Sequence, residues 1–387
     1  MASPATLARD LAALEEQGLK RRRRVLESPQ RARVKVDGRD YVAFCSNDYL
    51  GLAAHPELVA AAREGAERYG VGAGASHLVL GHTFAHHALE EALARFVRLP
   101  RALYFSTGYM ANLGIVTALA GRGDAVFADK LNHASLNDAA LLSRADFKRY
   151  AHCDVTALDR LLSASNAKAK LIVTDSVFSM DGDIAPLPEL LVLAEAHDAW
   201  LVIDDAHGFG VLGKSGRGAL ERFDLRSPRI VYMGTLGKAA GVYGAFVAGE
   251  PELIDTLVQR ARTYVYTTAT PPLVAHALLK SLELIERGAA RRERLRDLVA
   301  RLRRGLADSP WKLRESQTAI QPLVIGGSKE AVRVSEKLAA RGVLVPAIRP
   351  PTVPQGTARL RIALSADHTV EDVDVLVEAL NAIGSDA

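Results

Sequence analysis

The chain has 387 residues, of which 49% are hydrophobic and 24% charged, and its formal net charge is +4. This length and composition allow a large core in one to three domains, and the small net charge does not by itself predict nucleic-acid or membrane binding. Cys45 and Cys153 are too few for a disulfide framework or a four-cysteine zinc site, which favours a reducing cytosol. Without an apolar run of about 18 residues or an apolar leader, neither membrane insertion nor export is expected.

The first part of the chain is predicted to be an N-terminal arm. Residues 5–20 place leucines at helical spacing between charges, which indicates an amphipathic helix, and residues 20–24 (KRRRR) follow as a basic run. Residues 41–49 are expected to be extended, and residues 55–68 return to helical spacing. The arm is therefore assigned to residues 1–45.

The middle of the chain has the rhythm of an α/β domain. Its short apolar runs lie at residues 102–105, 125–128, 171–174, 200–203, 230–233 and 245–247. Helical patterns separate these runs, which is typical of a mostly parallel sheet covered by helices on both faces. Ligands of such sheets bind beyond the carboxyl ends of the strands. We assign this large domain to residues 46–285.

The last part of the chain, residues 286–387, is predicted to be a smaller α/β domain. It opens with an arginine-rich segment at residues 286–304, which indicates a long surface helix. The elements expected after it are strands at residues 320–325, 343–348 and 360–364 and helices at residues 329–340 and 369–382.

Two residues at the expected binding edge point to pyridoxal phosphate. Lys238 follows the apolar run 230–233, and Asp204 ends the run that begins at residue 200. A lysine can hold the aldehyde of this cofactor as a Schiff base, and a carboxylate can keep its pyridine nitrogen protonated. A buried Asp204 would be costly without such a cation. The alternatives are a surface lysine and an aspartate, Asp204 or Asp205, that caps the next turn.

Three other short patterns bear on phosphate, dinucleotide and metal binding. Gly108 and Tyr109 open a predicted helix, and backbone N–H groups at a helix start can bind a phosphate. Residues 70–74 (GVGAG) follow a helical pattern rather than a strand, so they do not form a dinucleotide fingerprint. His82 and His86 have the spacing of two ligands on one helix face, but the glutamate of a metalloprotease motif is missing, and no metal site is expected.

Seven segments, in order, make the chain similar to the α-oxoamine synthase family. They are residues 46–52 (SNDYLGL), 106–112 (STGYMAN), 132–135 (NHAS), 176–183 (SVFSMDGD), 204–208 (DDAHG), 235–238 (TLGK) and 359–361 (RLR). Members of this family condense an amino acid with an acyl-CoA and release carbon dioxide. The resemblance covers nearly the whole chain and implies a fold-type I pyridoxal-phosphate transferase that works as a homodimer.

The resemblance also implies roles in holding the cofactor. Lys238 would carry the cofactor and move the substrate proton, Asp204 would face the ring nitrogen, and His207 would hydrogen-bond the ring oxygen. His133 would stack on the ring and contact the substrate. Further cofactor contacts are implied for Gly108, Tyr109, Ser179, Thr235 and, from the neighbouring subunit, Thr268.

Substrate contacts follow from the same resemblance. Arg361 would bind the amino-acid carboxylate through its planar donors, with help from Asn47. Arg21 would meet the far carboxylate of the acyl substrate, and Thr352 would be another substrate contact. The structural alternatives are an arginine on a solvent-facing strand at Arg361 and a solvated charge within the basic run.

Within the family, two segments favour one pair of substrates. Residues 347–354 (AIRPPTVP) and 319–322 (AIQP) are most similar to members that join L-alanine to a pimeloyl thioester, carried by coenzyme A or a carrier protein, in biotin synthesis. Residues 74–81 (GASHLVLG) depart from the usual family sequence near the acyl substrate. Glycine C-acetyltransferase, 5-aminolevulinate synthase and serine palmitoyltransferase remain alternatives, as does a binding module whose basic run contacts nucleic acid or an acidic partner.

Overall fold

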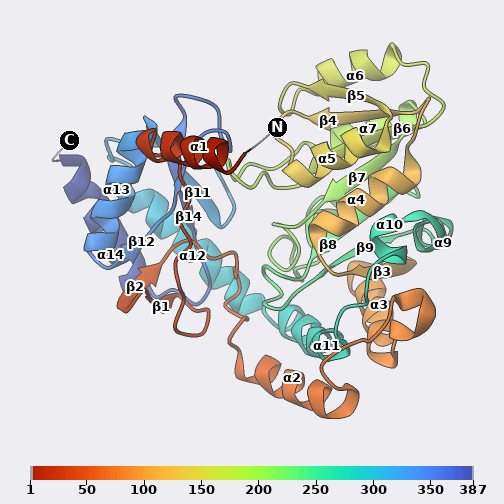
Figure 1. Cartoon of the computed structure of the whole chain (residues 1–387), viewed down its shortest axis with the longest axis horizontal. Helices are drawn as coiled ribbons and strands as arrows, with labels where there is room; N and C mark the ends of the chain where they lie inside the picture. The colour runs from red at the N-terminus through yellow and green to blue at the C-terminus, as the bar shows by residue number, and fades with distance from the viewer. Residues whose placement is uncertain (1–2, 386–387) are drawn as a thin grey trace. The chain divides into compact units, whose positions relative to one another are not determined.

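The computed structural model describes residues 3–385, and its contacts divide the chain into two compact units, which Figure 1 traces by residue number. The smaller unit comprises residues 3–49, 180–182 and 293–385, and the larger unit comprises the remainder. The N-terminal segment therefore groups with the C-terminal one. The three-part division predicted from the sequence, with boundaries near residues 45 and 285, stays a prediction.

The larger unit is built on a seven-stranded sheet with the order β3-β9-β8-β7-β6-β4-β5. Its strands are β3 (Arg101–Phe105), β4 (Ala125–Asp129), β5 (Asp146–Tyr150), β6 (Lys170–Asp175), β7 (Trp200–Asp204), β8 (Ile230–Thr235) and β9 (Ala245–Gly249). All neighbours from β8 to β5 are parallel, whereas β9 is antiparallel to β8 and to β3. The predicted mostly parallel sheet is confirmed. Edge strand β5 was missed because charges interrupt its apolar pattern.

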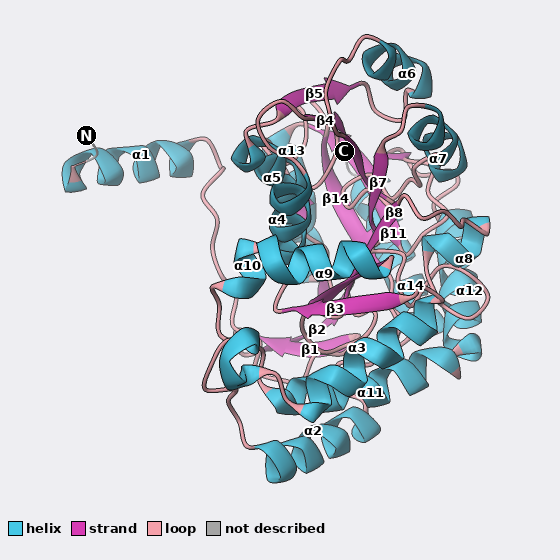
Figure 2. Cartoon of the chain, turned by 90° about the vertical axis from the view of Figure 1, so that its right-hand side faces the viewer, coloured by secondary structure: helices cyan, strands magenta, loops and turns pink. Residues whose placement is uncertain are grey.

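Helices lie on both faces of this sheet. The helices of the larger unit are α2 (Pro56–Tyr69), the short π-helix η1 (His77–Gly81), α3 (Phe84–Val97), α4 (Gly108–Leu119), α5 (Ala134–Ser143), α6 (Val155–Ser163), α7 (Leu187–Ala196), α8 (Ala219–Phe223), α9 (Pro251–Arg260), α10 (Arg262–Val265) and α11 (Pro272–Glu286). Figure 2 shows α6 and α7 across the strands from α4 and α5. Right-handed crossovers explain this placement, because the chain moves outward from β4 to β5 and then returns through β6 to β7.

One core cluster of the larger unit lies between the sheet and a layer of helices. Val126, Val173 and Val231 of the sheet pack with Ile115 of α4 and Leu136 of α5, and all five are at most 1% exposed. Parallel strands buried on both faces read as continuous apolar runs, which is why the sequence located them. No helix within residues 3–385 is both long and apolar enough to cross a membrane.

The smaller unit contains two small sheets and four helices or parts of helices. One sheet has the order β1-β2-β12 and the other the order β10-β11-β14-β13. The elements are α1 (Pro4–Glu16), β1 (Arg33–Val36), β2 (Arg39–Ala43), α12 (Ala289–Gly305), β10 (Lys312–Leu313), β11 (Ile320–Gly326), α13 (Ser328–Ala340), β12 (Val343–Leu344), β13 (Ala347–Ile348), β14 (Ala358–Ala363) and α14 (Val370–Ser385). The predicted N-terminal helix is confirmed, with Ser3 as its N-cap.

Three sequence predictions in this unit were wrong in detail. The single strand expected at residues 343–348 is two strands, because Pro346 lies between them and has no N–H to donate to a ladder. β12 pairs with β2, whereas β13 pairs with β14. The helix expected from residue 286 begins at Ala289, and the extended segment expected to reach residue 49 ends as a strand at Ala43.

The central position of β6 predicts a stability difference between two valine substitutions. Val173 is fully buried, whereas Val192 on α7 is 64% exposed. We expect Val173→Ala to lower the free energy of unfolding by about 2 kcal/mol, because two buried methyl groups and their contacts are lost. Val192→Ala should change it by less than about 0.5 kcal/mol. Urea unfolding followed by circular dichroism measures both, and equal effects would contradict the described core.

Candidate active site

Two buried aspartates end neighbouring parallel strands of the large sheet. Asp175 ends β6 and Asp204 ends β7, the two are paired in register, and each is 3% exposed. Asp204 accepts hydrogen bonds from the Asn112 side-chain amide at 2.7 Å and from the Ala206 backbone N–H at 3.0 Å. Asp175 accepts the backbone N–H of His133 at 2.6 Å. These donors are uncharged, so they do not neutralise the pair.

The pKa of Asp175 reports the strain of holding two carboxylates together. Burial raises this pKa well above its usual value, and the charge of Asp204 raises it further. The hydrogen bond from His133 and the charge of Lys238 act in the opposite direction. A second cation beside Asp204 would relieve the repulsion. The edge is therefore suited to a ligand that carries a protonated nitrogen.

Lys238 lies at the same edge of the sheet, in the turn that follows β8. Its Nζ is 2.9 Å from Nε2 of His207, which follows β7 and is 7% exposed. The turn is closed by the N–H of Gly241, which donates to the Lys238 carbonyl oxygen at 2.8 Å. The structure thus brings together Lys238 and His207, which the sequence predicted to belong to one cofactor site.

His133 caps α5 and faces the same charges. The N–H of Ser135 donates to Nδ1 of His133 at 3.3 Å, and the Ser135 hydroxyl lies 2.7 Å from the same atom. Desolvation by the surrounding atoms lowers the pKa of His133, the charge of Asp204 raises it, and that of Lys238 lowers it again. Because Nδ1 accepts hydrogen bonds, the ring proton is placed on Nε2. The ring is thus neutral, with a donor available.

Asn112 on α4 links these groups and was missed as a functional residue. Its side-chain amide donates to Asp204 and also, at 2.9 Å, to the hydroxyl of Ser135, which contacts His133. Asn112 is fully buried, and its Oδ1 has no hydrogen-bond partner among the described residues. A polar residue inside the apolar sequence of α4 was the available signal. Asp175 was also missed, although it is a charged residue at the end of an apolar strand, as Asp204 is.

The start of α4 offers free backbone donors. The Thr107 side chain accepts the N–H of Met110 at 3.1 Å, whereas the N–H groups of Gly108 and Tyr109 have no partner within residues 3–385. A Cβ added at Gly108 would come no closer than 3.6 Å to another atom, so the helix start is uncrowded. The hydroxyl of Thr235 is near this point but donates to the Gly244 carbonyl oxygen at 3.1 Å. Such a helix start can bind a phosphate.

Ser179 and Thr268 are the remaining predicted cofactor contacts, and Asp205 is the neighbour of Asp204 in the chain. Ser179 is half-buried, and Thr268 is exposed in the loop before α11. Asp205 does not cap the turn directly after it. It is fully buried and accepts hydrogen bonds from Tyr232 at 2.7 Å, from Ala219 N–H at 2.8 Å and from Ser176. Burial raises the pKa of Asp205 to about 6 despite these donors.

The predicted substrate-binding residues lie in the smaller unit. Arg361 on β14 is 5% exposed, and its guanidinium donates to Asn47 Oδ1 at 3.2 Å and to the Tyr49 hydroxyl at 3.5 Å. Burial raises the pKa of Tyr49, whereas the charge of Arg361 lowers it. Arg21 and Thr352 are both exposed. The structure therefore brings together Arg361 and Asn47, but it shows no contact of these two with Arg21 or Thr352 within the described residues.

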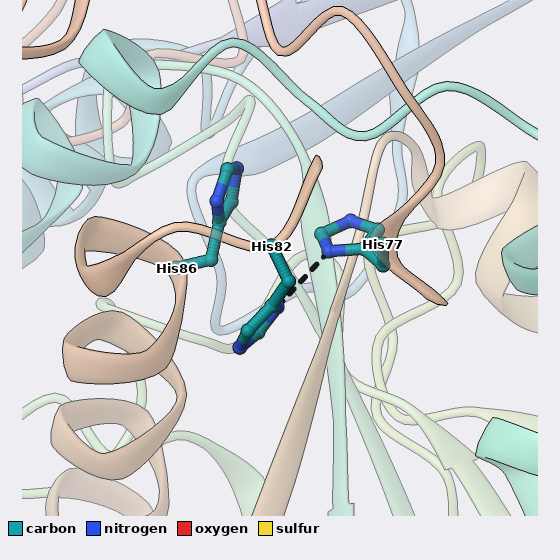
Figure 3. Close-up of side chains that lie close together, drawn as sticks. All are labelled: His77, His82 and His86. Atoms are coloured by element: carbon teal, nitrogen blue, oxygen red, sulfur yellow. Dashed lines mark hydrogen bonds between the residues drawn. The ribbon is translucent and has the colours of Figure 1, made fainter. Parts of the chain in front are cut away.

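The histidine pair noted in the sequence is part of a group of three, shown in Figure 3. Nδ1 of His77 lies 3.1 Å from Nδ1 of His82. Both nitrogens of His86 are engaged, because Nδ1 accepts the Thr83 N–H at 3.1 Å and Nε2 lies 2.7 Å from the Thr270 carbonyl oxygen. Burial lowers the pKa of His77 to about 3, so its ring is neutral. Backbone groups thus occupy both ring nitrogens of His86. Of this group, only His77 and His82 remain to offer nitrogens to a metal ion, which is fewer than the ligands of a tetrahedral site.

A second group, at the end of β4, is held by charge. His152 lies between two carboxylates, with Nδ1 3.0 Å from Asp129 and Nε2 2.6 Å from Asp183. Asp129 also accepts the N–H of Cys153 at 2.7 Å. Although burial lowers the pKa of His152, the hydrogen bonds to Asp129 and Asp183 raise it to about 12. Both ring nitrogens therefore carry protons and do not serve as metal ligands.

The sequence of the chain is similar to a known protein family and to proteins that share one name. The sequence profile of the family described as aminotransferase class I and II matches residues 39–380. The chain is 66% identical over 368 residues to the 8-amino-7-oxononanoate synthase of Nitrosospira multiformis, covering 95% of this chain and 93% of that protein. It is 62% identical over 378 residues to the synthase of the same name from Nitrosomonas eutropha, covering 97% and 98%.

A solved structure with the same fold contains the cofactor that the sequence predicted. It is a serine palmitoyltransferase from S. paucimobilis with a bound PLP–myriocin adduct. The TM-score is 0.92 at 32% sequence identity, and the match covers 98% of this chain and 97% of that one. The chain therefore has the fold of fold-type I pyridoxal-phosphate enzymes.

The charged group at His152 predicts a pH-dependent stability. An unfolded histidine loses its proton near pH 6.5, whereas His152 keeps it up to about pH 12 when folded, so its contribution is complete below pH 6.5 and is lost as the pH rises. We expect His152→Gln to lower the free energy of unfolding. The difference between wild type and variant should become smaller by about 1.4 kcal/mol for each pH unit above neutrality. Urea unfolding at about pH 7, 8 and 9 measures this slope. A loss that is independent of pH would contradict the assignment.

Proposed function

We propose that this chain, which belongs to the aminotransferase class I and II family, joins L-alanine to a pimeloyl thioester and releases 8-amino-7-oxononanoate, carbon dioxide and a free thiol. It is a pyridoxal-phosphate-dependent acyltransferase of biotin synthesis. The observation that carries this conclusion is the identity of 66% and 62%, over nearly the whole chain, to two proteins named 8-amino-7-oxononanoate synthase.

The residues at the edge of the large sheet fit the cofactor. When bound, pyridoxal phosphate supplies a protonated pyridine ring that stabilises negative charge on the carbon next to the amine. Asp204 is the residue that would face the ring nitrogen, and a cation there would offset the cost of burying this carboxylate. Lys238 would hold the aldehyde. The free N–H groups of Gly108 and Tyr109 would bind the phosphate, together with Ser179 and Thr235.

Lys238 is also the proposed base. Its Nζ would accept the proton from Cα of alanine and later return a proton to the same carbon. His207, whose Nε2 lies 2.9 Å from Nζ, would keep the amine at this position. Nε2 of His133 would donate a hydrogen bond to the acyl carbonyl oxygen as negative charge develops there. The neutral state of this ring, held by Ser135, keeps that donor available at neutral pH.

Arg361 is the proposed ligand of the alanine carboxylate. A guanidinium can bind both carboxylate oxygens at once, and Asn47 fixes its orientation through the 3.2 Å hydrogen bond. Arg21 would bind the far carboxylate of the pimeloyl group, and Thr352 would be a further substrate contact.

We also propose a cytoplasmic homodimer in which Thr268 reaches the phosphate of the neighbouring subunit. Apolar side chains are exposed beside it: Leu78, Val79, Leu80, Phe84 and Tyr266 are between 51% and 82% exposed. The N–H of Ala269 donates to the Ala75 carbonyl oxygen, so the loop that carries Thr268 lies against this apolar segment. An exposed apolar surface of this kind is typical of a subunit interface.

Glycine and serine are the competing amino acids. The serine palmitoyltransferase fold match has 32% identity, half of that to the two synthases, so it does not favour a serine substrate. Incubation of the purified protein with pimeloyl-CoA and each of the three amino acids, followed by mass spectrometry, separates the alternatives. We expect 8-amino-7-oxononanoate from alanine, and faster turnover of glycine or serine would contradict the proposal.

Replacement of Lys238 tests the cofactor attachment. We expect Lys238→Ala to lose the covalent bond that borohydride reduction fixes between protein and cofactor, and to lose about 10³-fold or more in turnover because the base is removed. The exposed Lys214 provides the control variant Lys214→Ala, which should keep both. Mass spectrometry of the reduced protein measures the attachment. A cofactor still fixed to the Lys238→Ala protein would contradict the assignment.

Replacement of Arg361 tests the carboxylate site. We expect Arg361→Ala to raise KM for alanine about 100-fold, because two charge-assisted hydrogen bonds are lost, and Arg361→Lys to recover part of the loss. KM for the thioester should change by less than about threefold, and Arg333→Ala on the surface of α13 should change neither. Steady-state kinetics with each substrate varied measure the two constants. Equal increases in both KM values would argue against this role.

A further inference from the structure

The smaller unit contains a pocket of about 760 Å³ with a basic rim and an apolar floor. The rim carries five cationic side chains, from the basic run and from the segment after β13: Lys20, Arg22, Arg23, Arg24 and Arg349. The floor is formed by Val332, Leu344, Val345, Pro346 and Ala347. The volume is in the range of small-molecule sites, and an apolar floor with a few charged groups is their usual lining.

The acidic residues of this pocket do not balance the cationic ones. They are Glu15, Asp37 and Glu336. Glu15 is shared by Lys20 at 2.7 Å and Arg22 at 2.6 Å. Asp37 accepts the backbone N–H of Val25 at 2.9 Å. The lining thus has an excess of positive charge, although the net charge of the whole chain is small.

Five cationic and three acidic residues leave the lining with an excess of two positive charges, and three of its guanidinium groups form no ion pair among the described residues. Arg23 and Arg24 are exposed and have no hydrogen bond or ion pair with any residue that the structure describes. Arg349 donates to the carbonyl oxygen of Gly18, a partner that orients the group without neutralising it. Arg21, the residue proposed for the far carboxylate of the acyl group, does not line the pocket. The three groups are therefore available to an anion other than that carboxylate.

We propose that this pocket binds the phosphate ester of the phosphopantetheine arm that carries the pimeloyl group. Guanidinium groups bind phosphate oxygens in pairs of parallel hydrogen bonds, and the apolar floor suits the uncharged part of the arm. Coenzyme A and an acyl carrier protein share this arm, so the pocket recognises what is common to both. The inference rests on the proposed function, because it presumes a pimeloyl thioester as substrate.

The test compares thioesters with and without the phosphate. Pimeloyl-CoA, pimeloyl carrier protein and S-pimeloyl-N-acetylcysteamine, which has no phosphate, are assayed with the holoenzyme and with Arg23→Ala/Arg24→Ala. The measured quantity is the ratio of kcat/KM for a phosphate-bearing thioester to kcat/KM for the phosphate-free thioester. We expect this ratio to fall about tenfold or more in the variant. The loss should arise in KM, and KM for alanine should not change. Arg341→Ala, an exposed arginine outside the pocket, is the matched control.

Salt and charge give two further readouts. The wild-type advantage of pimeloyl-CoA over the phosphate-free thioester should decrease between about 50 and 300 mM salt, and the variant should lack most of this dependence. The double lysine variant Arg23→Lys/Arg24→Lys should recover part of the ratio, since it keeps the charge but not the paired donors.

Each outcome of this comparison has a defined meaning. An equal loss with all three thioesters, or no change in the ratio, would overturn the proposal. A loss with the carrier protein alone would also overturn it, because the rim would then bind the surface of that protein rather than the shared phosphate. Failure of the wild-type enzyme to turn over any pimeloyl thioester with alanine would instead reject the proposed function on which the inference rests.

Discussion

The site depends on two buried carboxylates that end adjacent parallel strands. Asp175 and Asp204 are paired in register at the edge of the sheet, and each is almost entirely removed from water. Burial of a single unpaired carboxylate costs several kcal/mol, and two in contact repel each other as well. Their backbone and amide donors reduce this cost without supplying positive charge. A protonated ring nitrogen against Asp204, as proposed above, would supply that charge, so the repulsion between the two carboxylates would favour binding of the cofactor.

The same aspartate, Asp204, is connected to His133, the proposed substrate contact. Asn112 donates one hydrogen bond to Asp204 and another to Ser135, which holds the ring of His133. One buried amide therefore links the carboxylate of Asp204 to the serine whose backbone N–H sets the tautomer of His133. Loss of either hydrogen bond would leave a buried polar atom without its partner, which costs free energy.

The sequence predicted the parts of the site that follow directly from strand patterns. Asp204 and Lys238 each follow an apolar run, and parallel strands bring their carboxyl ends to one edge, so their proximity could be expected. Asp175 has the same position after its own strand but was not singled out, because the family motif begins one residue later. Asn112 was included in a motif without a role, since its partners come from β7 and α5 and only the fold brings them together.

Predictions failed where a local rule was overlooked or where contacts are long-range. Pro346 divides one apolar run into two strands that join different sheets, and the missing N–H of proline was the signal to use. Edge strand β5 is charged because it has a solvent-facing side, so its apolar pattern is weak. The basic run at residues 20–24 was recognised, but its association with Arg349 in one pocket depends on contacts across more than 300 residues of sequence.

The protonation state of the cofactor nitrogen tests the central claim most directly. The measurement is the ¹⁵N chemical shift of the pyridine nitrogen in ¹⁵N-labelled pyridoxal phosphate bound to the protein, followed as a function of pH. We predict a protonated nitrogen from about pH 6 to pH 9 in the wild-type protein and a neutral one in Asp204→Asn, where the charge of the partner is removed. A neutral nitrogen in the wild-type protein, or a protonated one that is unaffected by Asp204→Asn, would contradict the account.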